Sequence, residues 1–154
     1  MPRERKWARE LDISGNRLNE LIAFSKQYNE KKARIKSESY ISATVCTGTP
    51  SAHSNSSPVE RIAERCQKEK ADTELIEHCV KVACSMQEGL YPYILKAVTN
   101  DITYEHLGPP CCRNTYYQYC RRYFILLDRE QKKIKEWYCN NNKKSTIDSV
   151  DNIE

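Results

Sequence analysis

The sequence predicts an all-α protein: a small helical bundle with a C-terminal helix-turn-helix and a long terminal helix. Three observations support this fold class. The chain has only four glycines, with 39% hydrophobic and 30% charged residues, which is typical of helices joined by few tight turns. Its 154 residues are enough for one domain with its own core. Between residues 58 and 138, apolar residues recur mostly at intervals of three and four, as on one face of a helix.

The first 36 residues predict a basic arm followed by a helix. In "RLNELIAFSKQYNEKKARI" (17–35), apolar residues such as Leu18, Leu21 and Ile22 have helical spacing, and Asn16 is the predicted N-cap. The Ser/Thr-rich segment 37–57 shows no period and predicts a flexible linker, which would let the first helix move. A short strand at "YISATVC" is disfavoured, because a lone strand is not stable in water.

A helical domain is predicted over residues 58–138. Pro58 begins a helix that runs to Glu88 as the main scaffold, either unbroken or interrupted at Asp72 and Thr73. Gly89 ends it, and "LYPYILKAVTN" predicts the next helix, with Pro92 in its first turn.

The helix-turn-helix is predicted at residues 103–127. "ITYEHLG" forms a short helix capped by Thr103 and ended by Gly108, and the following prolines forbid its continuation. A second helix starts near Asn114, the predicted N-cap. Its inward face carries Tyr116, Tyr119, Cys120, Tyr123, Phe124 and Leu127. Residues 139–154 are predicted to be a polar, acidic tail.

The outward face of the second helix is the candidate DNA-binding site, formed by Thr115, Tyr117, Gln118, Arg121 and Arg122. Arginine forks onto guanine, glutamine pairs with adenine, and hydroxyl groups reach phosphates. Segment 102–144 contains nine basic and four acidic residues, and its basic charge favours a phosphate backbone as partner. Further phosphate contacts are expected from Arg113, Arg129, Lys132 and Lys133. A plain helical bundle with solvated arginines stays open as the alternative.

An apolar seam with heptad-like spacing follows the same helix through Tyr116, Cys120, Tyr123, Leu127, Ile134 and Trp137. We expect this seam to pack on the scaffold helix. A homodimer that reads two DNA half-sites is the alternative.

The sequence gives little support for disulfides, metal binding or catalysis. No C-x-x-C pair accompanies the eight cysteines, so reduced thiols are expected, with Cys66, Cys79, Cys84 and Cys120 buried and no metal or cofactor. Without a phosphate-binding glycine loop or a nucleophile elbow, we do not expect an enzyme. No apolar run reaches about 18 residues and the charged start lacks a signal peptide's apolar region, so a cytoplasmic location without a membrane partner is expected.

Three segments, "SPVERIAERCQ", "LYPYILKAVTNDITYEHL" and "PCCRNTYYQYCRRYFILLD", carry a family resemblance. Over residues 58 to about 130 the chain resembles phage and prophage proteins of Firmicutes, of the ArpU and RinA type of transcriptional regulator, whose C-terminal part is similar to the fourth region of a sigma factor. The five outward residues match the family's recognition face, whereas "GPPCCR" departs from its usual turn.

The resemblance implies a sequence-specific DNA-binding regulator in a bacterial host cell. Double-stranded DNA is the expected partner, and RNA polymerase or another host protein is a further one. Two alternatives remain. One is a phage-encoded interaction protein that inhibits or remodels a host nuclease or polymerase, and the other is a packaging factor like a terminase small subunit.

Overall fold

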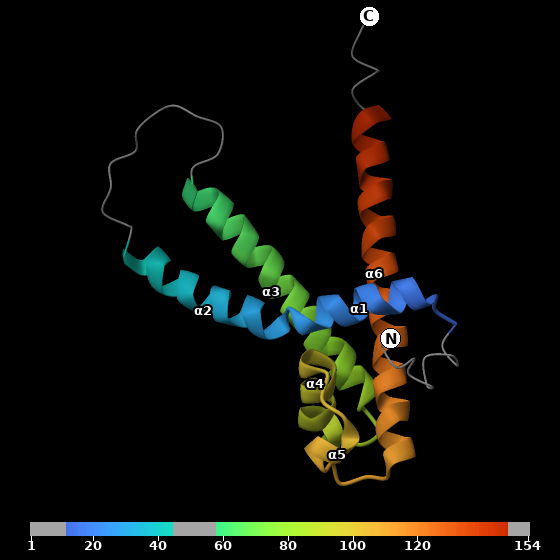
Figure 1. Ribbon diagram of the computed structural model, residues 1–154. Helices are drawn as coiled ribbons and strands as arrows, with labels where there is room; N and C mark the ends of the chain where they lie inside the picture. Colours follow the sequence, from blue (N-terminus) through green and yellow to red (C-terminus); the bar gives the residue numbers. More distant parts are fainter. Residues whose placement is uncertain (1–11, 45–57, 148–154) are drawn as a thin grey trace, which may run out of the picture.

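The computed structural model describes residues 12–44 and 58–147, and it describes side chains over 12–38 and 59–140. Within these ranges every regular element is helical, which confirms the predicted all-α class (Figure 1). The elements are α1 (Gly15–Lys26), α2 (Tyr28–Thr44), α3 (Pro58–Ala83), the short 3-10 helix η2 (Glu88–Leu90), α4 (Tyr91–Asn100), α5 (Tyr104–Leu107) and α6 (Arg113–Ile147).

The N-terminal helical region differs from the prediction in three ways. Ser14, not Asn16, caps α1, because its side chain accepts a hydrogen bond from the backbone N–H of Arg17 at 3.3 Å. The predicted single helix over 17–35 is interrupted at Gln27, where α1 ends and α2 begins. Residues 37–44, predicted as linker, continue α2. The predicted arm up to residue 11 and the linker beyond residue 44 lie outside the described residues.

Helix α2 is joined to α3 by a row of ion pairs. Lys31 pairs with Asp72 at 2.7 Å, and Arg34 pairs with Glu69 at 2.9 Å. Further along, Arg65 pairs with Glu38. Helices α1 and α2 are therefore packed into the bundle, whereas the predicted linker would let the first helix move. The pairing partners lie too far apart in sequence for local patterns to reveal them.

Helix α3 begins at Pro58 as predicted and runs unbroken through Asp72 and Thr73. The Thr73 hydroxyl donates to the carbonyl of Lys70 at 2.9 Å, so its hydrogen-bonding capacity is satisfied inside the helix. The helix ends at Ala83, five residues before the predicted end at Glu88, and η2 leads directly into α4.

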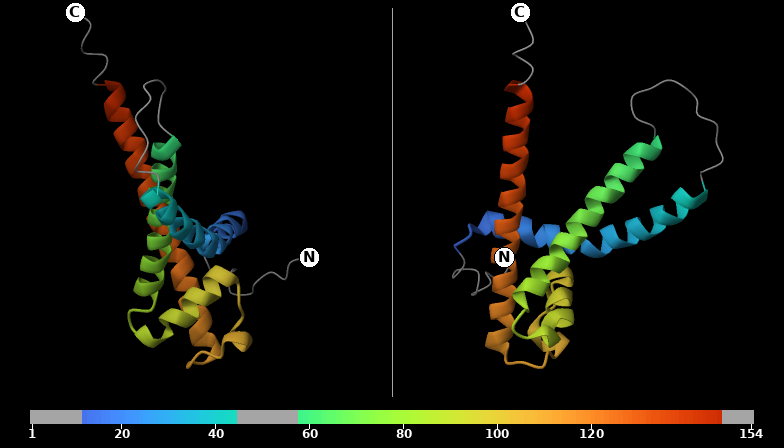
Figure 2. Two further views of the ribbon diagram at one scale, coloured as in Figure 1. Left: turned by 90° about the vertical axis from the view of Figure 1, so that its left-hand side faces the viewer. Right: turned by 180° about the vertical axis from the view of Figure 1, so that it is seen from behind.

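Helix α6 is 35 residues long, about 50 Å at 1.5 Å per residue. Its first half packs against α1, α3 and α4 around the core, and its second half extends away from the bundle (Figures 1 and 2). Residues 139–147, predicted as part of a polar tail, belong to this helix. The N-terminal end of α6 therefore lies beside α5 at one end of the molecule, and its C-terminal end lies at the other.

Candidate nucleic-acid interface

The candidate interface begins with the short helix α5 and the turn that connects it to α6. Gly108 ends α5 in the left-handed region at φ 54°, and its N–H donates to the carbonyl of Tyr104 at 3.1 Å. Thr103 precedes α5 as predicted, but its hydroxyl bonds to Nδ1 of His106 at 2.7 Å instead of a backbone N–H. Asn114 lies inside α6 and does not cap it, since the carbonyl of Cys112 already accepts from the N–H of Tyr116 at 3.0 Å.

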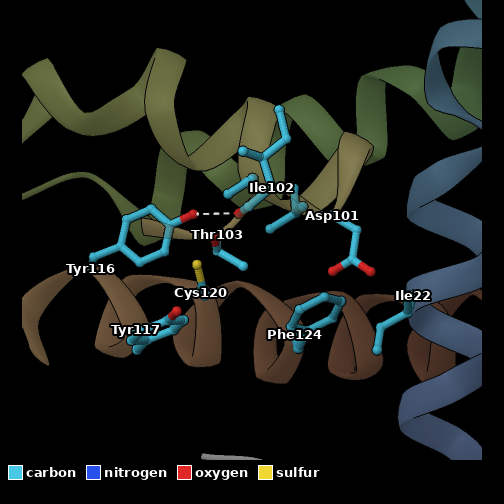
Figure 3. A pocket seen from close by; sticks show the side chains of 10 residues that line it. Ile22, Asp101, Ile102, Thr103, Tyr116, Tyr117, Cys120 and Phe124 are labelled. Atoms are coloured by element: carbon cyan, nitrogen blue, oxygen red, sulfur yellow. Dashed lines mark hydrogen bonds between the residues drawn. The ribbon is translucent and has the colours of Figure 1, made fainter. Parts of the chain in front are cut away.

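Two tyrosines fix the angle between α5 and α6. The Tyr104 hydroxyl donates to the carbonyl of Cys111 at 2.8 Å. The Tyr116 hydroxyl donates to the carbonyl of Ile102 at 2.9 Å (Figure 3). Their rings meet edge to face with centroids 5.6 Å apart. Tyr104 of α5 is thus bonded to the segment that leads into α6, and Tyr116 of α6 is bonded to the segment that leads into α5. We call this arrangement the tyrosine clamp.

A small cavity lies behind the clamp, between α6 and the ends of α1 and α4 (Figure 3). Its volume is about 220 Å³, and Asp101, Thr103, Cys120 and Phe124 are among the lining residues. Pockets that enclose a small organic ligand usually measure about 300 Å³ or more. The cavity is therefore too small to make a substrate site.

The inward face of α6 agrees with the prediction. Tyr116, Cys120, Tyr123, Phe124 and Leu127 are buried, and Tyr119 is half-buried. The Tyr123 hydroxyl lies 2.8 Å from the Ser25 hydroxyl, which in turn donates to the carbonyl of Leu21 at 2.8 Å. Burial raises the pKa of Tyr123, so this phenol stays protonated and donates to Ser25.

The predicted outward face divides into two groups. Gln118 and Arg122 are exposed, one helical turn apart, whereas Thr115, Tyr117 and Arg121 are half-buried. The Thr115 hydroxyl contacts the Cys112 sulfur at 3.0 Å, and Tyr117 lines the cavity. The guanidinium Nε of Arg121 is fully buried. The five residues therefore do not form one open surface, and the exposed stripe passes through Gln118, Arg122, Ile125 and Arg129.

Acidic side chains lie beside three of the four predicted phosphate-binding residues. Arg113 pairs with Glu105 at 3.3 Å, Lys132 with Asp128 at 2.7 Å and Lys133 with Glu130 at 2.7 Å. Sequence reasoning missed these acids, although the four- and three-residue spacings of the lysine pairs are a recognised signal for helical ion pairs. Arg122 and Arg129 are exposed and make no ion pair within the part of the chain that the structure describes.

The cysteines show a range of environments. Cys79, Cys84 and Cys120 are buried, as predicted, and burial raises the pKa of both Cys79 and Cys84 to about 11. Cys66 is only half-buried, and its thiol donates to Glu38 at 2.7 Å. Across residues 12–38 and 59–140, no three His, Cys, Asp or Glu side chains gather in a way that would hold a metal ion.

Compared with known protein families, curated proteins and solved structures, the chain matches none. Among the described helices, none combines the length and apolar character needed to cross a lipid bilayer.

Proposed function

We propose that this chain binds double-stranded DNA through α5, the turn and the first half of α6, and acts as a stoichiometric regulator of transcription. One observation carries the proposal: Gln118 and Arg122 are exposed one turn apart on a helix whose opposite face is buried. These two side chains are the types that pair with adenine and guanine edges in the major groove. Their four-residue spacing puts them on one line along the helix, as base contacts from a recognition helix require.

Rigid packing supports the proposal further. Tyr116, Tyr123 and Leu127 anchor α6 in the core, and the tyrosine clamp holds α5 beside it. A recognition helix held in this way loses little conformational entropy when it meets DNA.

Positive charge along the same side of α6 supplies candidate phosphate contacts. Arg129 continues the exposed stripe beyond Arg122 and makes no ion pair among the described residues. Exposed ion pairs are worth at most about 1 kcal/mol, so Arg113 and Lys133 exchange their carboxylate partners for phosphates at small cost. Lys132 is a weaker candidate, because its partner Asp128 is buried. The resemblance to phage regulators adds the expectation of a transcriptional role, with RNA polymerase as a second partner.

The test is a fluorescence anisotropy titration of the full chain against a duplex enriched from random DNA by the purified protein. Loss of a base contact at Gln118→Ala or Arg122→Ala costs about 1 to 3 kcal/mol, a fall in affinity of roughly five- to a hundredfold. If Arg122 binds a phosphate instead, the slope of log affinity against log salt becomes shallower by about 0.9. Lys70→Ala, an exposed lysine on α3, is the matched control and keeps both values. Equal affinity and slope in all variants would refute DNA binding by this face.

A second candidate function is inhibition or remodelling of a host nucleic-acid-handling protein. One observation favours it: the apolar Ile125, 42% exposed, lies between Arg122 and Arg129 in the middle of the exposed stripe. Apolar side chains near the centre of a surface are typical of protein interfaces. Purification of the chain from nuclease-treated cells distinguishes the candidates, because a stoichiometric protein partner that Ile125→Glu releases supports the second. Large ring-shaped assemblies would instead indicate the packaging role.

A further inference from the structure

The second half of α6 carries an apolar surface that the bundle does not cover. Ile134, Trp137 and Tyr138 are 44%, 61% and 58% exposed. They continue the core-facing side of the helix, because Ile134 lies seven residues after the buried Leu127 and Trp137 three residues further. The rings of Trp137 and Tyr138 contact each other edge to face at 5.1 Å. Helices in proteins are stabilised mainly by packing of their apolar face, so this part of α6 lacks its packing partner.

These side chains form one wall of a groove, and α3 forms the other. Ala71, Leu75 and Glu64 line the α3 side, opposite Ile134, Trp137 and Tyr138. The groove measures about 930 Å³. It opens because α3 and α6 diverge from the point where they leave the core (Figures 1 and 2). The two walls of one molecule therefore diverge, and the groove between them stays open.

We propose that this groove is a homodimer surface, in which the second half of α6 from another copy of the chain lies between α3 and α6. The occupant must present aromatic and aliphatic side chains to both walls. The second half of α6 itself has such a stripe, so each copy carries both the groove and the helix that fills it. In a dimer with a two-fold axis, the helix of each copy fills the groove of the other, so every contact occurs twice. Most dimers have this symmetry.

Charge agrees with this occupant. Between residues 129 and 138, α6 carries four basic and two acidic side chains, whereas α3 from 59 to 83 carries five basic and six acidic ones. In the dimer each basic helix lies against the more acidic wall of its partner. Glu64, Lys68 and Asp72 line the groove on α3, and Lys133 lines it on α6. Of the acidic lining residues, Glu64 forms no ion pair with any described side chain, and a basic side chain of the second copy would complement it.

The exposed area sets the expected strength. A fully buried aromatic side chain removes about 150 to 250 Å² from water, so Trp137 and Tyr138 together supply about 250 Å² of exposed surface per copy. Stable interfaces bury about 800 Å² per partner. The aromatic pair provides roughly a third of that area and the groove walls add to it, so the interface belongs to the small sizes at which weak and transient complexes are found.

The test is sedimentation equilibrium of the full chain between about 1 and 100 µM without DNA. The wild type is expected to pass from monomer to dimer, and both Ile134→Glu and Trp137→Ala are expected to raise the dissociation constant at least tenfold. Ile62→Glu is the matched control: it changes the same residue type at nearly equal exposure, 40% against 44%, on α3 but outside the groove lining. This control is expected to dimerise as the wild type does.

Circular dichroism identifies any variant that loses helix instead of a contact. A wild-type chain that stays monomeric throughout would overturn the proposal, because another partner must then cover the groove. Dimerisation that survives in both Ile134→Glu and Trp137→Ala would also overturn it. The measurement contains no nucleic acid, and the groove lies at the end of α6 opposite Gln118 and Arg122, so its failure is distinguishable from failure of the DNA-binding proposal.

Discussion

The buried hydrogen bond between Ser25 and Tyr123 predicts an asymmetric pair of mutational effects. Both side chains are fully buried, and their hydroxyl oxygens are 2.8 Å apart where α1 crosses α6. Ser25 donates its own proton to the carbonyl of Leu21, so Tyr123 donates to Ser25. Ser25→Ala therefore leaves the buried Tyr123 hydroxyl without its acceptor. Tyr123→Phe removes this donor, and the Ser25 hydroxyl then loses one incoming hydrogen bond but still donates to the carbonyl of Leu21.

The magnitudes follow from these two situations. A lost buried hydrogen bond costs about 0.5 to 1.5 kcal/mol, so Tyr123→Phe is expected to destabilise by about 1 kcal/mol. An unsatisfied buried donor costs about 1 to 3 kcal/mol, from which about 0.5 kcal/mol is recovered because alanine is the better helix former. Ser25→Ala is thus expected to cost about 0.5 to 2.5 kcal/mol, with a central value of about 1.5 kcal/mol. The double variant has neither hydroxyl and is expected to be more stable than Ser25→Ala alone.

Urea unfolding followed by circular dichroism at helix wavelengths measures all four proteins of this cycle. The expected result is a non-additive cycle with an interaction free energy of about 1 kcal/mol or more, with unchanged dependence of the unfolding free energy on urea. If the two single effects add up, or if Tyr123→Phe costs more than Ser25→Ala, the assigned donor direction is wrong.

Three further predictions concern charge, backbone and thiol chemistry. Burial opposes ionisation of Asp128, but hydrogen bonds from Lys132 and Arg17 outweigh it and lower the pKa of this carboxyl. The stabilisation from the ionised carboxylate is therefore complete above the unfolded pKa of about 3.9 and is lost as pH falls through the folded pKa. Asp128→Asn should flatten the acid limb of a curve of unfolding free energy against pH. Gly108→Ala should cost about 1 kcal/mol, seen as a lower unfolding midpoint, because φ is 54° there; an unchanged midpoint would contradict this strain. Hydrogen bonding to Thr115 lowers the pKa of the exposed Cys112 thiol, whereas burial raises the pKa of Cys79 and Cys84 to about 11. A thiol reagent should therefore modify Cys112 quickly in the native chain and modify Cys79 and Cys84 only on unfolding. The reverse order of labelling by mass spectrometry would be inconsistent with the packing.

Local sequence signals predicted the elements that depend on local chemistry. Pro58 marks the start of α3, Pro92 lies in the first turn of α4, and Gly108 ends α5, each because a fixed or unusual backbone angle is needed there. The break at Gln27 has no such marker. It depends on tertiary contacts just after it, where the Tyr28 hydroxyl donates to Glu77 and the Asn29 side chain donates to that of Asn100. Such contacts join residues about 50 and 70 positions apart and leave no local pattern.

The candidate site was predictable on its buried side and less so on its exposed side. Apolar spacing identified Tyr116, Tyr123 and Leu127 correctly, because burial of a helix stripe follows the helical period. On the opposite side, the prediction used residue type alone and placed every polar residue on the outward face. Long amphipathic side chains at the border of a helix face bury their stems, and for this reason Tyr117 and Arg121 are half-buried while Gln118 and Arg122 are not.

The tyrosine clamp has a consequence for how this protein could diverge from its relatives. Tyr104 and Tyr116 both bond to backbone carbonyls, and every amino acid provides such a carbonyl. The clamp therefore places no demand on the side chains at 102 and 111. Within the Pro-Pro-Cys-Cys run at 109–112, Pro109 is buried and Cys111 packs against the core, whereas Pro110 and Cys112 are exposed and can change without altering the clamp. We expect relatives to keep two tyrosines twelve positions apart while the exposed residues at 110 and 112 vary.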